Sequence, residues 1–295
     1  MDRRPSASGF RYDATEVVRK VEEMNLELQD KVAIVTGGAM GIGEAAARKL
    51  AGEGAVVAIF DVNREAGTKT AADIAKSGAR CEFYQCDVSK AREVENAVGA
   101  VAAKHGGIDV LVSNAGIQDY GDVVSTTEEA WDHLMGINLK GCFLLSKHAA
   151  PHMTKRGNAA IVVVGSVQSM TAIGNSVAYV TAKHGLLGLT RAMALDYAQK
   201  GIRVNCVCPG AIDTPMLRWA ASLDPNPERV LRVCDRMHAL GRMGKAEEVA
   251  DAIVYLASPR ASFITGAALL VDGGMLVPTG GMGFQEGGTG AATHD

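Results

Sequence analysis

Three side chains in the middle of the sequence have the types and spacing of a proton-transfer site. Ser166 ends the apolar run AAIVVVGS, and Tyr179 and Lys183 follow it in AYVTAKHGLLGLT. Residues four apart share one face of a helix, so the lysine ammonium would lie beside the phenol. A phenol is a poor base at neutral pH because its ordinary pKa is about 10. A neighbouring cation stabilises the phenolate, so the spacing predicts a tyrosine that works as a general acid or base.

A glycine-rich turn earlier in the chain has the form of a phosphate-binding site. The run KVAIVT leads into Gly37, Met40, Gly41, Ile42 and Gly43, and then into the helical sequence EAAARKLAGEG. Glycines let the backbone turn tightly and approach a pyrophosphate, and a helix N-terminus adds unpaired N–H groups. The turn therefore predicts a dinucleotide site.

The acidic residue after the next apolar run bears on the choice of dinucleotide. AVVAIFD ends in Asp61, eighteen residues after Gly43, where such folds place a carboxylate that accepts hydrogen bonds from ribose hydroxyls. A carboxylate about 4 Å from a 2′-phosphate would cost on the order of 4 kcal/mol per charge at an effective dielectric of about 20. Met40 and Asn63 offer no cation to offset that cost, although Arg64 is close in sequence. NAD is therefore predicted in preference to NADP.

The elements that must position these residues form a repeating pattern. Apolar runs alternate with longer helical segments, and seven runs are predicted strands: 31–36, 55–61, 79–87, 108–114, 159–166, 202–208 and 267–273. Strands that are apolar throughout are buried on both faces, so helices must cover both sides of the sheet. The pattern predicts a single α/β domain with a doubly wound parallel sheet of the Rossmann type. Right-handed crossovers place all the strand ends along one edge, where we expect the ligands to bind.

The predicted catalytic domain covers residues 28–277, and three segments depart from its pattern. Residues 1–27 form an extension with a short helix, for which Asp13 and Glu16 resemble a capping box. Between 213 and 244 the pattern lapses into two predicted helices interrupted at Pro225 and Pro227, and this insertion would form a lid at the ligand edge. The tail, 278–295, has too much glycine and too little apolar mass to hold one conformation by itself.

Composition argues against several classes of protein. The 295 residues are 47% hydrophobic and 21% charged, with a formal net charge of −3. That balance disfavours nucleic acid and anionic membrane surfaces as partners, and no apolar run approaches the roughly 18 residues of a membrane span.

The six cysteines form no CxxC pair, so we expect reduced thiols in a cytoplasmic protein, with Cys206 and Cys208 on one face of a strand. His148 and His152 have helical spacing but no third ligand, so no metal is predicted.

Together these motifs resemble the short-chain dehydrogenase/reductase family. The resemblance covers roughly 28–277 and rests on TGGAMGIG, Asp87, SNAG at 113–116, Asn138 in GINLKG, the Ser166, Tyr179 and Lys183 set, and PG at 209–210 before Thr214. It implies that Tyr179 is the catalytic acid/base and that Lys183 stabilises its phenolate and binds the nicotinamide ribose. It also implies that Ser166 orients the reacting oxygen and that Asn138 positions a proton-relay water. The cofactor contacts that it implies are Gly37, Met40, Gly41, Ile42, Gly43, Asp61, Asp87, Val88, Asn114, Ala115, Gly116, Tyr179, Lys183, Pro209, Gly210, Ile212 and Thr214.

The residues expected around the reacting carbon are mostly polar. They are Gln118, Ser166, Gln168, Asn175, Tyr179, Met216, Arg218 and Trp219. Buried amides and hydroxyls need partners and would penalise a bare alkyl chain. The predicted function is therefore NAD-dependent hydride transfer on a secondary alcohol, ketone or sugar hemiacetal, with a sugar, polyol or sugar-derived hydroxy acid as substrate in carbohydrate metabolism. The resemblance also implies self-association as a homotetramer.

Three alternative functions remain open at this point. NAGIQ and AYVTAKHGLLGLT also resemble 3-hydroxybutyrate dehydrogenases, which have histidine and lysine where this chain has Gln168 and Ser176, so that Arg218 would have to bind the carboxylate. A 3-oxoacyl-thioester reductase is the second alternative, but such enzymes usually favour NADPH, against which Asp61 argues. The third is an NAD-sensing or scaffolding module without turnover, against which the complete set of four catalytic residues argues.

Overall fold

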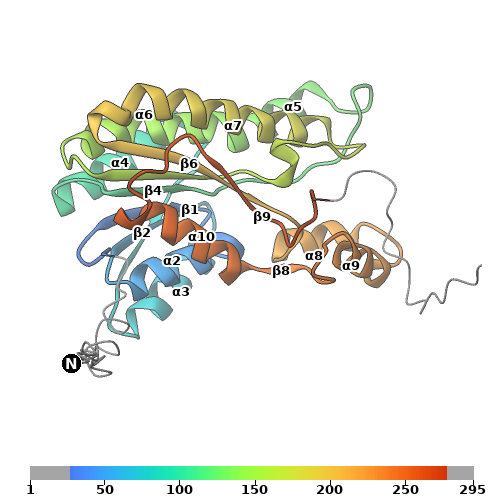
Figure 1. The fold of residues 1–295 in the computed structure, drawn as a ribbon, viewed down its shortest axis with the longest axis horizontal. Helices are drawn as coiled ribbons and strands as arrows, with labels where there is room; N and C mark the ends of the chain where they lie inside the picture. Colours follow the sequence, from blue (N-terminus) through green and yellow to red (C-terminus); the bar gives the residue numbers. More distant parts are fainter. Residues whose placement is uncertain (1–26, 278–295) are drawn as a thin grey trace, which may run out of the picture.

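The computed structural model describes residues 27–277, in which a parallel sheet lies between two layers of helices (Figure 1). The strands are β1 (Val32–Thr36), β2 (Val56–Asp61), β3 (Arg80–Gln85), β4 (Val110–Ser113), β5 (Ala159–Val164), β6 (Ile202–Pro209) and β9 (Ala268–Val271). They pair in the order β3-β2-β1-β4-β5-β6-β9, and every pair is parallel. The predicted doubly wound sheet is confirmed. The predicted N-terminal helix and glycine-rich tail fall outside the described residues.

The helices divide between the two faces of the sheet. One face is covered by α2 (Gly41–Gly52), α3 (Arg64–Ala75) and α10 (Ala246–Ala257), and the other by α4 (Ala91–His105), α6 (Gly141–Thr154) and α7 (Val177–Tyr197) (Figure 1). A shorter helix, α5 (Glu128–Met135), packs beside α7. No helix of residues 27–277 combines the length and the apolar character that crossing a membrane requires.

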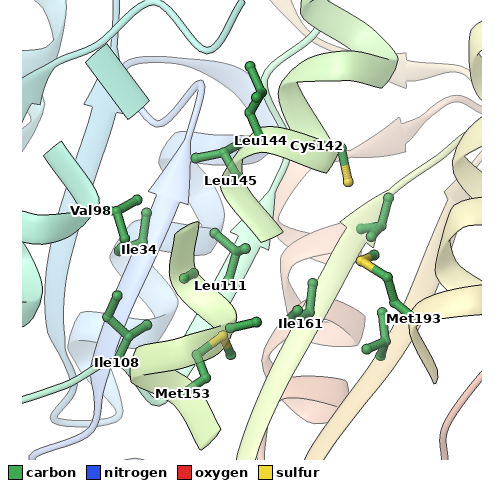
Figure 2. Packing of buried hydrophobic residues seen from close by; sticks show 14 of the residues in the cluster. Ile34, Val98, Ile108, Leu111, Cys142, Leu144, Leu145, Met153, Ile161 and Met193 are labelled. Carbon is green, nitrogen blue, oxygen red and sulfur yellow. The ribbon is translucent and has the colours of Figure 1, made fainter. Parts of the chain in front are cut away.

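Burial follows the position of each strand in the sheet. Every residue of β1, β4 and β5 is buried, because each of these strands has a neighbour on both sides and a helix layer on both faces. Ile34, Leu111 and Ile161 from these strands meet side chains of α4, α6 and α7, among them Val98 and Met193 (Figure 2). The edge strands β3 and β9 are partly exposed. Removing each large apolar side chain from water contributes about 1.5–3 kcal/mol, so the central strands hold the sheet together.

The strand order fixes where ligands can bind. β1 has β2 on one side and β4 on the other, so the helices after β1 and β4 leave the sheet toward opposite faces and a crevice opens between the strand ends. The glycine-rich turn follows β1, and Asn114 follows β4. Next along the sheet, β5 and β6 bring Ser166 and Gly210 to the same edge.

The segment 213–244, predicted as a lid, contains two helices. They are α8 (Pro215–Ser222) and α9 (Pro227–Arg236), and each begins at a proline that follows a side-chain cap, Thr214 or Asn226. Figure 1 shows both helices beyond the end of the sheet. Two short strands, β7 (Ile212–Asp213) and β8 (Gly244–Lys245), pair at the base of the segment. The sequence analysis missed them, because a strand of two residues has no apolar periodicity.

Candidate active site

A continuous trough runs along the carboxyl ends of the strands. Its first part is lined by Asp87 and Val88, its middle part by the glycine-rich turn, and its last part by Ser166, Tyr179 and Lys183. Gly116 lines all three parts, which makes them one site. The last part, called the reaction cleft below, has a volume of about 750 Å³. Its walls come from β1, β4, β5, β6, α7 and α8, or from the residues that follow them.

The structure places nearly all the predicted cofactor contacts on this trough. They include Asp87 and Val88 in the first part, Gly37, Met40 and Gly41 in the middle, and Pro209, Gly210, Ile212 and Thr214 in the reaction cleft. Gly43 is the exception, because it lies behind the turn and packs against the backbone of Gly37.

The glycine-rich turn fits an anionic group. Gly37 and Gly41 have φ of +62° and +59°, a region that favours glycine. At the start of α2, Met40 supplies no side-chain cap, so the first N–H groups of the helix are left for a ligand. The backbone geometry and the helix N-terminus therefore suit the pyrophosphate of a dinucleotide.

Asp61 is fixed at the rim of this turn. Its Oδ2 accepts a hydrogen bond from the backbone N–H of Ala39 at 3.1 Å, and its Oδ1 accepts one from Asn63 at 2.9 Å. The Arg64 guanidinium, which the sequence analysis left as a possible phosphate ligand, donates to Oε1 of Gln85 at 3.0 and 2.6 Å. The Asp61 carboxylate thus lines the trough, whereas the Arg64 guanidinium is bonded to Gln85 at the end of β3.

Thr36 joins the ends of β1 and β4, a role that the sequence analysis missed. Its hydroxyl oxygen accepts hydrogen bonds from the N–H groups of Asn114 and Ala115, both at 3.0 Å. In return, Nδ2 of Asn114 donates to the carbonyl oxygens of Thr36 and Gly37, at 2.9 and 3.2 Å. A hydroxyl at the end of an otherwise apolar strand was the available sequence signal. This network fixes the wall between the glycine-rich turn and the reaction cleft.

Lys183 and Tyr179 meet on α7, as their spacing predicts. The Lys183 Nζ lies 5.4 Å from the centroid of the Tyr179 ring and donates to the carbonyl oxygen of Val164 at 2.9 Å. The lysine is only 6% exposed, and its ammonium has two further N–H bonds to offer the cleft. Ser166, at the end of β5, lines the same cleft, and its Oγ accepts from the N–H of Gln168 at 3.1 Å. A hydroxyl, a phenol and an ammonium therefore converge on one wall.

Asn138 lies outside the lining of the cleft, in a wide turn between α5 and α6. The turn is a π-helix, η1 (Gly136–Lys140), a form that recurs at functional sites. The Asn138 Oδ1 accepts from the N–H of Ile117 at 2.8 Å, and its Nδ2 donates to the carbonyl oxygen of Ile117 at 2.9 Å. The side chain is 2% exposed. Asn138 therefore holds the chain that follows β4 against the trough.

The predicted substrate contacts divide into two groups. Gln118 and Met216 line the reaction cleft with Ser166 and Tyr179, whereas Gln168, Asn175, Arg218 and Trp219 do not. Gln168 is buried, and its side-chain oxygen meets no hydrogen-bond partner among the described residues. Asn175 is exposed, Trp219 is 47% exposed, and Arg218 donates to Asp213 at 2.7 Å.

Apolar residues take much of the space that the sequence analysis gave to polar ones. Leu217 and Ala220 line the cleft with Met216, so α8 presents an apolar face to it. The spacing of these residues, within one turn of a helix, was a usable sequence signal. Tyr120 also lines the cleft, and burial, with smaller effects of Cys234 and Tyr179, raises its pKa above the ordinary value. Its hydroxyl therefore stays protonated at neutral pH.

The cysteines of the described chain are all unpaired thiols. Cys206 and Cys208 point to the same face of β6, as predicted, with their Sγ atoms 3.7 Å apart and both side chains fully buried. Within residues 27–277 there is no cluster of three or more His, Cys, Asp or Glu side chains that could hold a metal ion.

The switch-point crevice, the glycine-rich turn and the Ser166, Tyr179 and Lys183 wall define a dinucleotide-dependent oxidoreductase. A family model described as "Enoyl-(Acyl carrier protein) reductase" matches residues 37–276. The chain belongs to the short-chain dehydrogenase/reductase family. It is an oxidoreductase that acts on CH–OH groups and uses a nicotinamide cofactor.

The chain is similar to three proteins, two of which are named for a substrate. An uncharacterized oxidoreductase of Thermotoga maritima is 41% identical over 84% of this chain and 98% of its own length. The cis-4-hydroxycyclohexanecarboxylate dehydrogenase of Sinomonas cyclohexanicum is 42% identical over 83% of this chain and 96% of its own. The ligand-free structure of Thermoplasma acidophilum aldohexose dehydrogenase has a TM-score of 0.79 and 40% identity, covering 86% of this chain and 96% of that one.

Proposed function

We propose that this protein is a NAD-linked dehydrogenase of secondary alcohols that also reduces the corresponding ketones. The observation that carries the choice of cofactor is the position of Asp61, whose carboxylate lines the trough and is held at 3.1 Å by the N–H of Ala39. A carboxylate there suits a ribose 2′-hydroxyl, and it would repel a 2′-phosphate by on the order of 4 kcal/mol per charge at about 4 Å. The bond between Arg64 and Gln85 supports the same choice.

The wall of the reaction cleft suits proton transfer at a substrate hydroxyl. A nicotinamide bound in the cleft supplies the hydride acceptor. The alcohol then loses one hydride from its carbon and one proton from its oxygen, and the proton passes to the phenolate of Tyr179. The Lys183 ammonium, beside the ring, stabilises that phenolate, and Ser166 donates a hydrogen bond to the substrate oxygen.

Asn138 acts on the reaction through the backbone that it holds. One N–H and one lone pair of its amide are bonded to Ile117. A proton-relay water, which the family resemblance implies, would have to use the second N–H or the second lone pair. Loss of the side chain would therefore disturb both the relay and the position of Gly116.

The lining of the cleft supports a substrate with a compact apolar body. Ser166, Tyr179 and Lys183 supply polar groups at the reacting end, and α8 lines the cleft with Met216, Leu217 and Ala220. The Nε2 of Gln118 is already bonded to the carbonyl oxygen of Asp119 and to Ser176, at 3.0 and 2.9 Å. Hydroxyl groups placed against the α8 wall would lose water without gaining partners. An alicyclic secondary alcohol fits best, as the name of the Sinomonas relative also suggests.

A sugar or polyol is the second candidate substrate. It was predicted from polar residues, and Gln118, Ser166 and Tyr179 of that set do line the cleft. The likeness to an aldohexose dehydrogenase supports it as well. The α8 wall argues against it, because that wall offers no side-chain donor or acceptor at Leu217 or Ala220.

A substrate panel separates these candidates. The full chain is assayed by NADH or NADPH formation with cyclohexanol, cis-4-hydroxycyclohexanecarboxylate, 3-hydroxybutyrate, xylitol and glucose, and for NADH oxidation with an acetoacetyl thioester. We expect the highest kcat/KM with NAD and an alicyclic alcohol, at least about tenfold above the polyols, the size of effect that one mismatched polar contact produces. A highest kcat/KM on glucose or xylitol would favour the second candidate. A preference for NADP would contradict the role proposed for Asp61.

Self-association as a homotetramer also remains a proposal. An apolar groove between α5, η1, α6 and α7 supports it, with Met135, Leu139, Phe143 and Leu189 in its lining and Phe143 49% exposed. Exposed apolar grooves of this kind mark interaction surfaces in many proteins. Light scattering of the full chain tests the proposal. The cytoplasmic location predicted above rests on the sequence alone.

A further inference from the structure

His238, just after α9, is a buried side chain that none of the roles above uses. It is 2% exposed, although it belongs to a segment whose helices stand mostly in solvent. Its Nδ1 lies 2.8 Å from the carbonyl oxygen of Cys234, and its Nε2 lies 3.0 Å from the backbone nitrogen of Ala211. The ring therefore bridges the end of α9 and the chain that follows β6.

These two partners fix the protonation state of the ring. A carbonyl oxygen only accepts hydrogen bonds, so Nδ1 carries the proton. A backbone N–H only donates, so Nε2 must present a lone pair to Ala211. Only the neutral Nδ1–H tautomer makes both bonds. A second proton, at Nε2, would face the Ala211 N–H and break that bond.

The chain that His238 holds forms the floor of the reaction cleft. Pro209, Gly210, Ala211 and Ile212 line the cleft on one side, and on the other side Ile212 and the imidazole line a second cavity of about 570 Å³. The ring packs closely against this floor, because a Cβ added at Gly210 would lie 2.7 Å from the His238 Nε2. A single backbone segment, 209–212, therefore separates the reaction cleft from the imidazole.

We infer that His238 is a positioning residue, which in its neutral form ties the end of the lid segment to the floor of the reaction cleft and so holds the floor in place for the nicotinamide ring. The bond at Ala211 joins the end of the lid segment to the chain after β6, and the hydrogen bond from the N–H of Leu240 to the carbonyl oxygen of Gly273 joins it to the chain after β9. The inference rests on the proposed function, in which a nicotinamide bound in the reaction cleft would lie against the floor, Pro209–Ile212. It goes beyond that proposal by making the position of the nicotinamide depend on a hydrogen bond from a residue behind the floor.

The charged and titratable groups around the ring come from four segments. They are Cys234, Asp235 and Arg236 on α9, Arg242 before β8, Glu248 on α10 and Asp272 after β9. The carboxylates among them already accept hydrogen bonds: Asp235 from Met243, Glu248 from Arg242 and Lys245, and Asp272 from Gly274 and Leu276. Burial raises the pKa of the Cys234 thiol, so it stays neutral. Among the described residues, the two hydrogen-bond partners given for the ring are the backbone groups of Cys234 and Ala211, so these carboxylates do not take their place.

Two substitutions separate the two bonds of the ring. In His238→Asn, the amide nitrogen reaches the Cys234 carbonyl but nothing reaches Ala211. In His238→Gln, the longer side chain brings an oxygen to the place of Nε2, so an acceptor for the N–H of Ala211 remains. The Kd of each variant is measured for NADH, by fluorescence, and for ADP-ribose, which lacks the nicotinamide. Thermal melting of each variant provides the folding control.

At pH 8, we expect His238→Asn to weaken NADH binding by about tenfold, the effect of one lost buried hydrogen bond, while the ADP-ribose Kd changes less than about twofold. His238→Gln should match the wild type for both ligands. Equal NADH affinity in His238→Asn and wild type, or a His238→Gln variant that binds NADH as weakly as His238→Asn, would overturn the inference.

The same experiment distinguishes a failure of the seating from a failure of the inference. If the nicotinamide does not lie against Pro209–Ile212, His238→Asn will weaken NADH and ADP-ribose binding equally, whereas unchanged binding of both ligands counts against the role of His238. Nitrogen NMR of the wild-type chain with labelled histidine adds a test that needs no variant. It should show one Nδ1–H tautomer whose proton is protected from solvent exchange, because Nδ1 donates to the carbonyl oxygen of Cys234. An Nε2–H tautomer for that ring would sink the inference.

Discussion

The α-carbon of Gly43 lies so close to Gly37 that a Cβ added at residue 43 would sit 2.1 Å from the carbonyl oxygen of Gly37. The same atom would lie 2.5 Å from Nδ2 of Asn114. The glycine-rich turn and the chain after β4 can therefore pack together only if residue 43 has no side chain. Gly43 therefore acts by packing, behind the surface that meets the cofactor.

Gly43→Ala should damage both stability and cofactor binding. We expect a loss of about 1–3 kcal/mol in the free energy of unfolding, as for other overpacked sites, and at least a tenfold rise in the Kd for NADH. Gly52→Ala, in the same helix, is the matched control, because an added Cβ there meets nothing within 4 Å. Chemical denaturation and fluorescence titration measure the two quantities. Equal behaviour of the two variants would contradict the packing role.

Tyr179→Phe removes the hydroxyl assigned to proton transfer and little else. We expect kcat to fall by about 10²–10⁴, the usual share of a general acid or base, with the Kd for NADH changed less than about twofold. Tyr120→Phe provides the control, since that phenol lines the same cleft. It should retain turnover. A Tyr179→Phe enzyme with near-normal kcat would remove this residue from the chemistry.

Asp61→Asn tests the choice between the two nicotinamide cofactors. The amide keeps an accepting oxygen for the N–H of Ala39 but loses the charge that repels a 2′-phosphate. The ratio of kcat/KM with NADP to that with NAD should rise at least tenfold, a conservative fraction of the estimated repulsion of about 4 kcal/mol. Asp87→Asn, at the far end of the trough, should change kcat/KM with NAD and with NADP by the same factor. An unchanged ratio in Asp61→Asn would count against the proposed selectivity.

Leu217→Asn tests the apolar wall on α8. A polar side chain of similar size should lower kcat/KM for an alicyclic alcohol by about tenfold and leave NADH binding unchanged. Leu223→Asn, at the end of the same helix and 58% exposed, is the control and should behave as wild type. If Leu217→Asn instead raises kcat/KM for the alicyclic alcohol, the proposed substrate class is wrong.

Glu248→Gln tests the ion pair that closes the base of the lid segment. The Arg242 guanidinium, helped by the N–H of Lys245, lowers the pKa of Glu248 from 4.5 to about 2. Because the pKa is lower in the folded state, the stabilisation is complete above about pH 4.5 and is lost as the pH falls toward 2. The Tm difference between wild type and variant should therefore be present at pH 7 and shrink over that interval. If the Tm difference between wild type and Glu248→Gln is the same at pH 7 and pH 2.5, the charge of Glu248 does not stabilise the fold.

The sheet could be predicted because its strands are apolar almost throughout. Each of the seven predicted strands corresponds to a described one, and the ends differ by up to two residues, as where 79–87 becomes Arg80–Gln85. The ends moved because strand pairing, rather than composition, decides the last residues. β7 and β8 could not be predicted, since Ile212 and Gly244 meet only after the lid segment has folded back.

The site divides in the same way between local and tertiary information. The glycine-rich turn, Asp61 and the Tyr179 and Lys183 pair have fixed spacings in sequence, so they could be found there. Which face of α8 meets the cleft depends on how that helix packs, and this decides whether Leu217 or Trp219 reaches a ligand. His238 gave no signal at all, because its partner Ala211 lies 27 residues away.

The wide turn of η1 restricts how the length of the chain can vary. Successive residues of a helix are rotated by about 100°, and the π-helix absorbs the extra residue that brings Asn138 opposite Ile117. Deleting any one residue of Gly136–Lys140 would make the helix more regular and turn the amide away from its partner. Natural variants should thus tolerate exchanges of side chain in this turn far better than insertions or deletions, a bias that sequencing of functional survivors from a deletion library would reveal.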